Sequence, residues 1–126
     1  MSIADWQILI VEDENDSHEV VQTILAYHNI QSIHAATAED ALVMLADTTP
    51  TLIIIDLALP GMDGWQLLAA LNTMAHLANV PRVAITAYHH LELADQALAA
   101  GFDAYFAKPI EAASFVHDLA AVIENK

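Results

Sequence analysis

The stretch Leu52-Ile53-Ile54-Ile55-Asp56 places a carboxylate directly after four consecutive apolar residues. Such an unbroken apolar run is typical of a strand buried on both faces, as strands in parallel sheets are. A carboxylate at the end of such a strand is costly unless it is paired or bound to a metal ion. The stretch therefore predicts a central strand that ends in a functional aspartate.

Three more apolar runs end in the same manner, each in a chemically active side chain. These runs are Gln7–Val11 before Glu12 and Asp13, residues 82–85 before Thr86, and Ala104–Ala107 before Lys108 and Pro109. In a parallel sheet the last residues of all four strands meet at one edge, where open α/β sheets carry their sites. Carboxylates, a hydroxyl and a lone ammonium at that edge describe a site for a divalent metal ion and a phosphoryl group.

Segments with helical periodicity alternate with the apolar runs. The expected elements are helices over residues 16–27, 91–100 and 111–125, two helices that start after Thr37 and near Gly64, a strand over Gln31–Ala35, and a loop over residues 76–81. The first helix is expected to bury Val20, Val21, Ile24 and Leu25. Gly101 suits the left-handed conformation that often ends a helix.

Strand and helix therefore alternate five times, which indicates a parallel sheet covered on both faces. An eight-stranded barrel needs far more chain. We expect a doubly wound α/β fold whose five-stranded parallel sheet has the order 2-1-3-4-5, the flavodoxin-like (βα)5 arrangement. In that order the first and third strands are neighbours, so Asp13 and Asp56 are expected to lie side by side.

Composition narrows the possible functions. The chain has 126 residues, 56% of them hydrophobic, and no cysteine. We expect residues 1–126 to form one domain with no output domain, and disulfides and zinc–thiolate sites are excluded. No apolar stretch reaches the roughly 18 residues that span a bilayer, and no secretory signal opens the chain, so we expect a cytoplasmic protein without membrane insertion.

The net charge of the chain also narrows the possible functions. The formal net charge is −14, from 17 acidic residues against three basic ones, which are Arg82, Lys108 and Lys126. So acidic a chain has no basic surface with which to bind nucleic acid. A partner with a basic docking patch is expected instead.

Each candidate residue also has a simpler interpretation. Crowded carboxylates at Glu12 and Asp13 suit a divalent cation, but acids in a solvated loop also favour a following helix N-terminus. Asp56 can act as a nucleophile toward phosphorus, or it can serve as a turn or helix cap. The set is more informative than any member, because the predicted fold brings these carboxylates together.

The other two strand ends carry similar alternatives. The Thr86 hydroxyl can donate to a phosphoryl oxygen, although a β-branched residue often simply ends a strand. Lys108 can neutralise a phosphoryl group, or it can be a surface lysine. Strand alternation puts Tyr105 on the face opposite Lys108, where it is part of the core, the edge or a mobile switch. His89 and His90, after Thr86, are expected to be exposed.

These motifs, taken in order, resemble one family. The residues that carry the resemblance are Glu12-Asp13, Asp56 with Pro60 and Gly64, Thr86-Ala87, and Lys108-Pro109. From Trp6 to about Asn125, the chain resembles a response-regulator receiver domain of two-component signalling. The resemblance implies a signalling protein that catalyses only its own phosphorylation and slow dephosphorylation, not an enzyme acting on other substrates.

The resemblance also implies a role for each site residue. Asp56 would accept a phosphoryl group from a phosphohistidine on a histidine kinase or a histidine phosphotransfer protein. Mg²⁺ would be held by Asp13, Asp56 and the backbone carbonyl of Ala58, with Glu12 acting through water. Thr86 and Lys108 would contact the phosphoryl oxygens. Movement of Thr86 would let Tyr105 turn inward and change the face that binds a downstream protein target, formed by the fourth helix, the fifth strand and the fifth helix.

Two positions in this family tune the lifetime of the phosphoryl group, and here they are Ala58 and Tyr88. Ala58 has no group that could orient an attacking water, and Tyr88 can shield the phosphorus, so slow self-dephosphorylation is expected. Ala58 also argues against a phosphatase with an aspartate nucleophile, which needs a second acid there. A flavin-binding protein is disfavoured by the acidic first loop. A receiver-like interaction module that works without phosphorylation remains an alternative.

Overall fold

A computed structural model of the chain describes residues 2–88 and 90–126. The elements in chain order are η1 (Ile3–Asp5), β1 (Gln7–Val11), α1 (Asn15–Tyr27), β2 (Gln31–Ala35), α2 (Ala38–Leu45), β3 (Leu52–Asp56), α3 (Gly64–Leu71), η2 (Ala75–Leu77), β4 (Arg82–Thr86), α4 (Leu93–Ala100), β5 (Ala104–Ala107) and α5 (Ala112–Glu124), where η marks a short 3-10 helix. All strand pairs are parallel, and the order is β2-β1-β3-β4-β5. The predicted doubly wound fold is confirmed.

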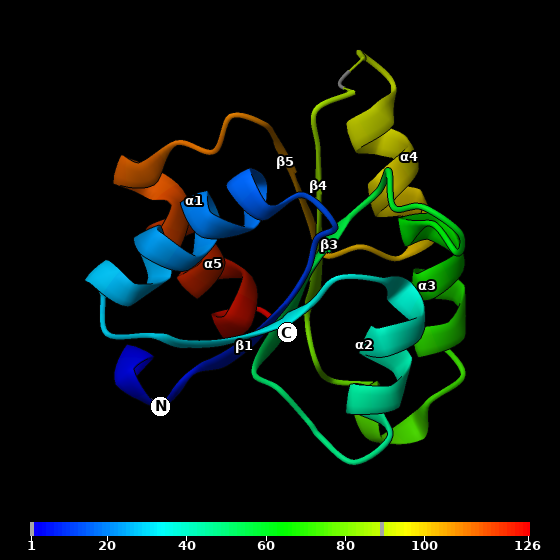
Figure 1. Cartoon of the computed structure of the whole chain (residues 1–126), viewed down its shortest axis with the longest axis horizontal. Coiled ribbons are helices and arrows are strands. Elements are labelled where there is room, and N and C mark those ends of the chain that lie inside the picture. The colour runs from blue at the N-terminus through cyan, green and yellow to red at the C-terminus, as the bar shows by residue number, and fades with distance from the viewer. Residues whose placement is uncertain (1, 89) are drawn as a thin grey trace.

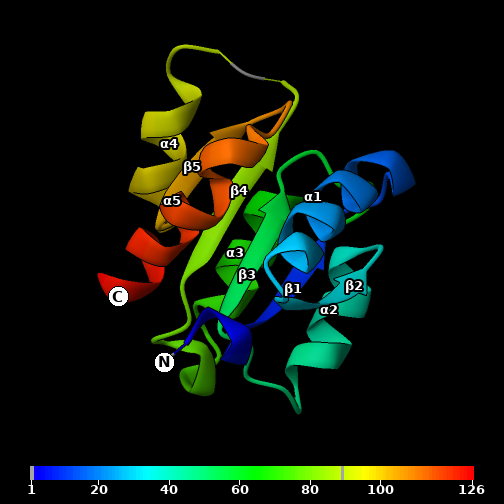
Figure 2. The same cartoon turned by 90° about the vertical axis from the view of Figure 1, so that its left-hand side faces the viewer.

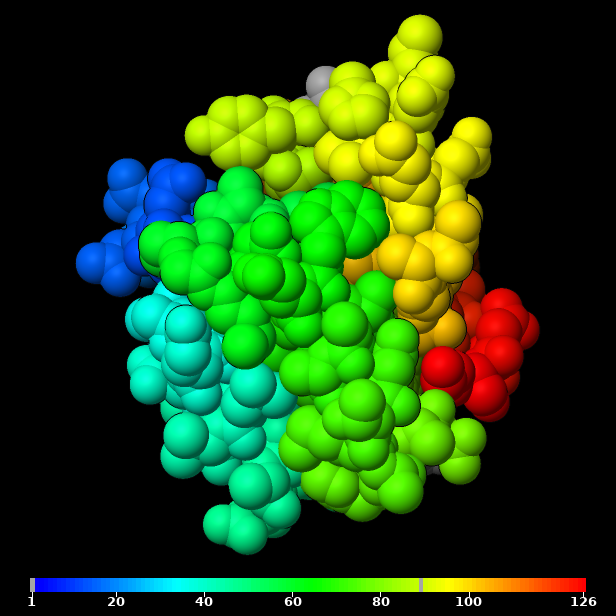
Figure 3. Space-filling model, turned by 90° about the vertical axis from the view of Figure 1, so that its right-hand side faces the viewer, coloured from blue at the N-terminus to red at the C-terminus, as the bar shows by residue number. Residues whose placement is uncertain are grey.

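The sheet lies between two layers of helices (Figure 1). Helices α1 and α5 cover one face and lie in front of the strands in Figure 2. Helices α2, α3 and α4 cover the other face, and Figure 3 shows α3 in contact with α2 on one side and α4 on the other. Because the strands are parallel, their carboxyl ends lie at one edge of the sheet, and the helix layers cover its two faces.

Alternating side chains of the central strands build a core on each face. Ile8, Ile10 and Ile54 pack with α1 and α5, where the largest buried side chain is Phe115. Leu9 and Ile53 point to the opposite face and pack with α2, α3 and α4. Because β3 is buried on both faces, its sequence had to be apolar at consecutive positions, as LIII is.

Three helix ends have local causes that are visible in the sequence. The Thr37 hydroxyl accepts a hydrogen bond from Asp40 N and caps α2. Asp63 and Gln66 form a reciprocal capping box at the start of α3. Gly101, with φ of 122°, ends α4 in the left-handed conformation that was expected there.

The structure corrects three details of the sequence-based prediction. Helix α4 begins at Leu93 and not at Leu91: Gln96 N donates to the Glu92 carbonyl, and Leu91, in the turn before the helix, is 94% exposed. Val20 is 48% exposed and does not belong to the buried face of α1. The expected loop over 76–81 overlaps the short 3-10 helix η2, which buries Leu77 in the core.

Arg82 lies at the edge of the sheet opposite the strand ends that carry the candidate site. Its guanidinium is buried and donates hydrogen bonds to the carbonyls of Leu77 and Val80 and to Oδ1 of Asn72. These bonds connect β4 to the segment that follows α3. Arg82 is therefore a structural residue of that edge.

Candidate phosphoryl and metal site

The strand register brings the predicted residues together. Val11 pairs with Ile55, so Glu12 and Asp56 are the next residues of neighbouring strands. On the other side of β3, Asp56 pairs with Ile85, the residue before Thr86. Lys108 follows β5, and its backbone N–H donates to the carbonyl of Thr86 over 2.9 Å. Side chains from the ends of β1, β3, β4 and β5 thus share one edge.

The Lys108 ammonium is the centre of this cluster. Its Nζ lies 2.7 Å from Oε2 of Glu12, 3.1 Å from Oδ2 of Asp56 and 3.3 Å from Oγ of Ser17. The side chains of Glu12 and Asp56 are 0% and 4% exposed, and that of Lys108 is 14% exposed. An ammonium has three N–H groups, so these three acceptors use all of them.

Burial and neighbouring charges have opposing effects on the pKa values of Glu12 and Lys108. Burial raises the pKa of Glu12 from 4.5 to about 7; the hydrogen bond from Lys108 opposes this rise, and the nearby Asp56 carboxylate adds to it. Burial alone would lower the pKa of Lys108, but its hydrogen bonds to Glu12 and Asp56 and their charges raise it above its ordinary value. Two carboxylates and one ammonium leave an excess of negative charge at this edge, which a cation would relieve.

The carboxylates of Glu12, Asp13 and Asp56 form a group that fits a metal ion. One oxygen from each lies within 4.8 Å of the others, and Asp13 is exposed whereas the other two are buried. Carboxylate oxygens are the ligands that hard divalent cations such as Mg²⁺ and Ca²⁺ take. The donor set fits the cation that the sequence predicted.

The turn after Asp56 holds the aspartate in place. The backbone N–H of Ala58 donates to Oδ1 of Asp56 over 2.9 Å. Gly64, at the start of α3, approaches so closely that an added Cβ would lie 2.5 Å from the Asp56 carbonyl oxygen and 2.7 Å from Leu57 Cα. Only glycine allows this contact between two backbones, which explains why a glycine follows the turn.

Thr86 and Tyr105 lie where strand alternation puts them. Thr86 is buried, and its Oγ1 accepts a hydrogen bond from Tyr88 N over 3.1 Å. The Tyr88 side chain is 74% exposed. Tyr105 is half-buried against the core under α2, α3 and α4, on the face opposite Lys108, and burial raises the pKa of its hydroxyl. His90 is exposed, as expected, and His89 lies outside the described residues.

Two polar contacts of the site were not foreseen from the sequence. One is the Ser17 hydroxyl beside Lys108, in the first turn of α1. The other is His34 of β2, whose Nε2 donates to the carbonyl of Glu12 over 2.7 Å. The His34 ring stacks on His18 with centroids 3.6 Å apart. Nothing in the local sequence marks these residues, because each contact depends on which way a side chain points in the folded chain.

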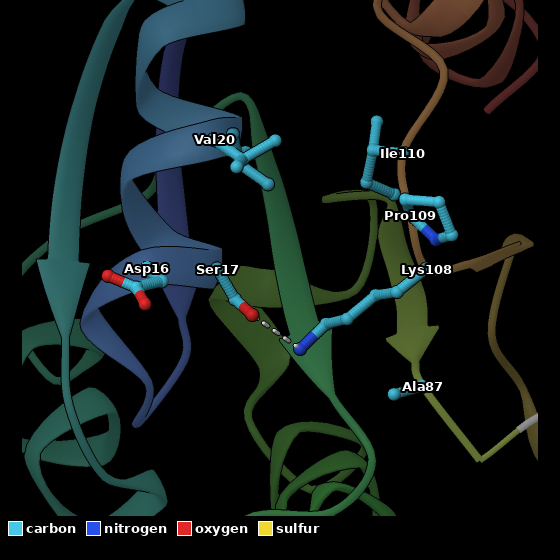
Figure 4. Close-up of a pocket in the computed structure, with 8 residues that line it drawn as sticks. Asp16, Ser17, Val20, Ala87, Lys108, Pro109 and Ile110 are labelled. Carbon is cyan, nitrogen blue, oxygen red and sulfur yellow. Dashed lines mark hydrogen bonds between the residues drawn. The ribbon is translucent and has the colours of Figure 1, made fainter.

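A pocket of about 360 Å³ opens beside the Lys108 side chain, between α1 and the segment after β5 (Figure 4). Its lining is mostly apolar, from Val20, Val21, Ala87, Pro109 and Ile110, with Asp16, Ser17 and Lys108 as the polar members. The Lys108–Pro109 peptide bond on its wall is cis. The exposure of Val20 follows from this pocket, because Val20 lines it instead of entering the core.

The fold and the site together define a doubly wound α/β domain with an acidic cluster and a lysine at the carboxyl edge of its sheet. A family model of the response regulator receiver domain matches residues 8–120. The chain therefore belongs to the response regulator receiver domain family, the receiver modules of two-component signalling.

Relatives and solved structures agree with this assignment. An uncharacterized 14.6 kDa protein of Leptolyngbya boryana is 31% identical over 110 residues, which cover 87% of this chain and 84% of that protein. The phosphate regulon transcriptional regulatory protein PhoB of Klebsiella pneumoniae is 32% identical over 119 residues; the match covers 94% of this chain and 52% of PhoB, so the chain spans about half its length. A CheY-like receiver domain protein of Methanospirillum hungatei has a TM-score of 0.84 at 27% identity, over 95% of this chain and 94% of that one.

Receiver domains are signalling modules that interact with histidine kinases and downstream effectors. They bind a divalent metal ion at a cluster of acidic residues, as Glu12, Asp13 and Asp56 form here. Among the residues that the structure describes, no helix has the length and apolar character needed to cross a membrane.

Proposed function

We propose that this chain is a stand-alone response regulator in which Asp56 accepts a phosphoryl group from a phosphohistidine partner, a histidine kinase or a histidine phosphotransfer protein. The reaction depends on Mg²⁺ held by Asp13, Asp56 and the Ala58 carbonyl, with Glu12 acting through water. Phosphorylation then changes the face formed by α4, β5 and α5, which binds a downstream protein target.

One observation carries this proposal above all. The nearly buried Asp56 carboxylate lies 3.1 Å from the Lys108 ammonium and within a cluster of three acidic side chains. A structural ion pair needs one carboxylate for one ammonium. The additional acids favour a site that receives a cation and, with it, an anionic group.

The chemistry follows from the positions of these groups. An Asp56 carboxylate oxygen forms a bond to phosphorus while the bond from phosphorus to the donor's imidazole nitrogen breaks, and that nitrogen keeps the electron pair. The bound cation supplies charge neutralisation for the phosphoryl oxygens. Lys108 adds a second positive charge on the side of α1, and the Thr86 hydroxyl is the donor on the side of β4.

The switch uses residues that lie between the acceptor and the partner face. Thr86 Oγ1 accepts a hydrogen bond from Tyr88 N, so movement of this hydroxyl toward a phosphoryl oxygen would shift the segment after β4 with it. The half-buried Tyr105 of β5 lies one strand away and turns inward when that segment moves. This is a two-state element biased by one charged group.

The partner chemistry rests on charge. Helices α4 and α5 and the residues directly before them carry Glu92, Asp95, Glu111 and Asp118, of which the first three are exposed. A partner with a basic patch complements this face, and raising the salt concentration is expected to weaken their binding. The stand-alone role is supported by the relative of Leptolyngbya boryana, 84% of which this chain covers.

Intact mass spectrometry after incubation with acetyl phosphate tests the proposal directly. Wild type and Asp56→Asn are compared with Mg²⁺ and with a chelator in its place. A single phosphoryl adduct is expected, and only in wild type with Mg²⁺. If folded wild type gains no adduct under any of these conditions, the proposal is wrong, and the chain is an interaction module that works without phosphorylation.

A further inference from the structure

Lys108 holds its position through contacts of two kinds. Glu12 and Asp56 accept hydrogen bonds from its ammonium at 2.7 and 3.1 Å, and both carboxylates are buried, so they attract the ammonium inward. Ser17, from the first turn of α1, accepts at 3.3 Å and lines the pocket beside Lys108 (Figure 4). Ser17 is therefore the acceptor on the open side of the ammonium.

The two carboxylates have other tasks in the reaction. Both belong to the acidic cluster that would hold the metal ion, so their oxygens are shared between the cation and Lys108. One Asp56 oxygen would also be taken up by the bond to phosphorus, and Lys108 contacts only Oδ2 of this carboxylate. The Ser17 hydroxyl carries no charge and is not part of the acidic cluster, so its hold on the ammonium does not change when the carboxylates are occupied.

From this geometry we infer that Ser17 is a positioning residue for phosphoryl transfer, which keeps the Lys108 ammonium beside the acceptor while Glu12 and Asp56 are engaged. The inference rests on the proposed phosphorylation of Asp56. Lysine has a long side chain with many rotamers, and one fixed anchor on the pocket side limits them.

The variants that test this inference are Ser17→Ala, which removes the hydroxyl, and Ser17→Thr, which keeps it. Thr23→Ala is the matched control, because it removes a hydroxyl from the exposed surface of the same helix, about two turns further on. The rate of Asp56 phosphorylation is measured by intact mass over a range of phosphoramidate concentrations with saturating Mg²⁺. Ser17→Ala is expected to lower the maximal rate by roughly three- to tenfold, the effect of losing one hydrogen bond, with the half-saturating donor concentration unchanged. Ser17→Thr and Thr23→Ala are expected to stay within about twofold of wild type.

A double-mutant cycle distinguishes positioning from a general structural effect. In a Lys108→Met background, Ser17→Ala is expected to cause no further loss of rate. The chain has only two lysines, Lys108 and Lys126, so nitrogen-15 spectra of the lysine ammonium groups give a second readout without any phosphodonor. Ser17→Ala is expected to shift or broaden the Lys108 signal and to leave the Lys126 signal in place.

The outcomes separate this inference from the proposed function. If wild type is phosphorylated and Ser17→Ala reacts equally fast, the role of Ser17 is wrong and the function stands. If the loss of rate persists in the Lys108→Met background, Ser17 acts on the fold and the inference is again wrong. If wild type gains no phosphoryl group, the function fails and the role of Ser17 in transfer fails with it, whatever the lysine spectra show.

Discussion

The Lys108 ammonium lies 2.7 Å from the buried carboxylate of Glu12, although 96 positions separate the two residues in the chain. Asp56 lies on the other side of the same ammonium. Removing the Lys108 ammonium would leave the carboxylates of Glu12 and Asp56 without a positive partner in a poorly hydrated site. This relationship predicts that Lys108 contributes to stability, in addition to the role in phosphoryl transfer that we propose for it.

We therefore expect Lys108→Met to lower the free energy of unfolding of the metal-free protein by about 1–3 kcal/mol. Mg²⁺ should restore much of that loss, because the cation replaces the missing positive charge. Urea denaturation of wild type and variant, with Mg²⁺ and with chelator, measures both effects. A loss that Mg²⁺ leaves unchanged would show that the Lys108 side chain stabilises by packing and not by its charge.

Metal affinity should depend on the protonation of Glu12. Its pKa is about 7 in the metal-free site, and a carboxylate must lose its proton before it can hold the cation or its water. The affinity for Mg²⁺ is expected to rise about tenfold per pH unit below pH 7 and to level off above it. Isothermal titration at several pH values measures this, and Glu12→Gln is the control that should flatten the dependence between pH 5.5 and about 7.5.

The stability of the metal-free protein should change with pH in the opposite sense. The pKa of Glu12 is raised above its unfolded value, so the native state binds more protons than the unfolded state between pH 4.5 and about 7. The contribution of Glu12 to stability is therefore present below about pH 4.5 and is lost as the pH rises through 7. Urea denaturation in chelator should show wild type losing stability relative to Glu12→Gln across this window; parallel curves would contradict the expectation.

Gly64→Ala should disturb the acceptor through the backbone. The new Cβ would lie 2.5 Å from the carbonyl oxygen of Asp56, and neither backbone can yield as a flexible side chain does. We expect a loss of about 1–3 kcal/mol in the free energy of unfolding together with slower phosphorylation. Gly101→Ala is a useful comparison, since it is strained by its φ of 122° but lies far from Asp56 and should leave the phosphorylation rate of the folded fraction unchanged.

The lifetime of phosphorylated protein should depend on Ala58. This exposed residue has no side-chain group that can orient water. Ala58→Asn is expected to speed hydrolysis of the phosphoryl group about tenfold, the effect of a hydrogen bond worth ~1.4 kcal/mol in the transition state. Phosphoprotein isolated from acetyl phosphate and followed by intact mass gives the rate. Ala87→Asn places an amide at another exposed position near the site and is the control. It should leave the rate of hydrolysis unchanged.

Much of the fold could be predicted because buried strands restrict composition. The four apolar residues before Asp56 had to be buried on both faces, and that requirement leads to a parallel sheet. Once the strand order was expected, Asp56 and Lys108 had to lie at one edge. Thr86 had to lie at that edge too, because it is the last residue of β4.

The remaining contacts depend on side-chain direction, which periodicity does not report. Nothing in the sequence distinguishes Ser17, and only the folded structure shows that its hydroxyl lies beside Lys108. Arg82 looked like one of three scarce cations, but its guanidinium is buried and bonded to backbone carbonyls. Val20 matched the apolar period of α1 and yet lines a pocket, because the period gives the helix face and not the width of the buried stripe.

The contacts of Lys108 reach back 96, 91 and 52 positions along the chain, to Glu12, Ser17 and Asp56. No fragment that lacks β5, the last strand of this sheet along the chain, carries them. A nascent or partly unfolded chain therefore has an aspartate at position 56 but no lysine beside it. If Asp56 is the phosphoryl acceptor that we propose, only a chain with a complete sheet can be phosphorylated, so the phosphoryl-donating partner would act on folded protein alone.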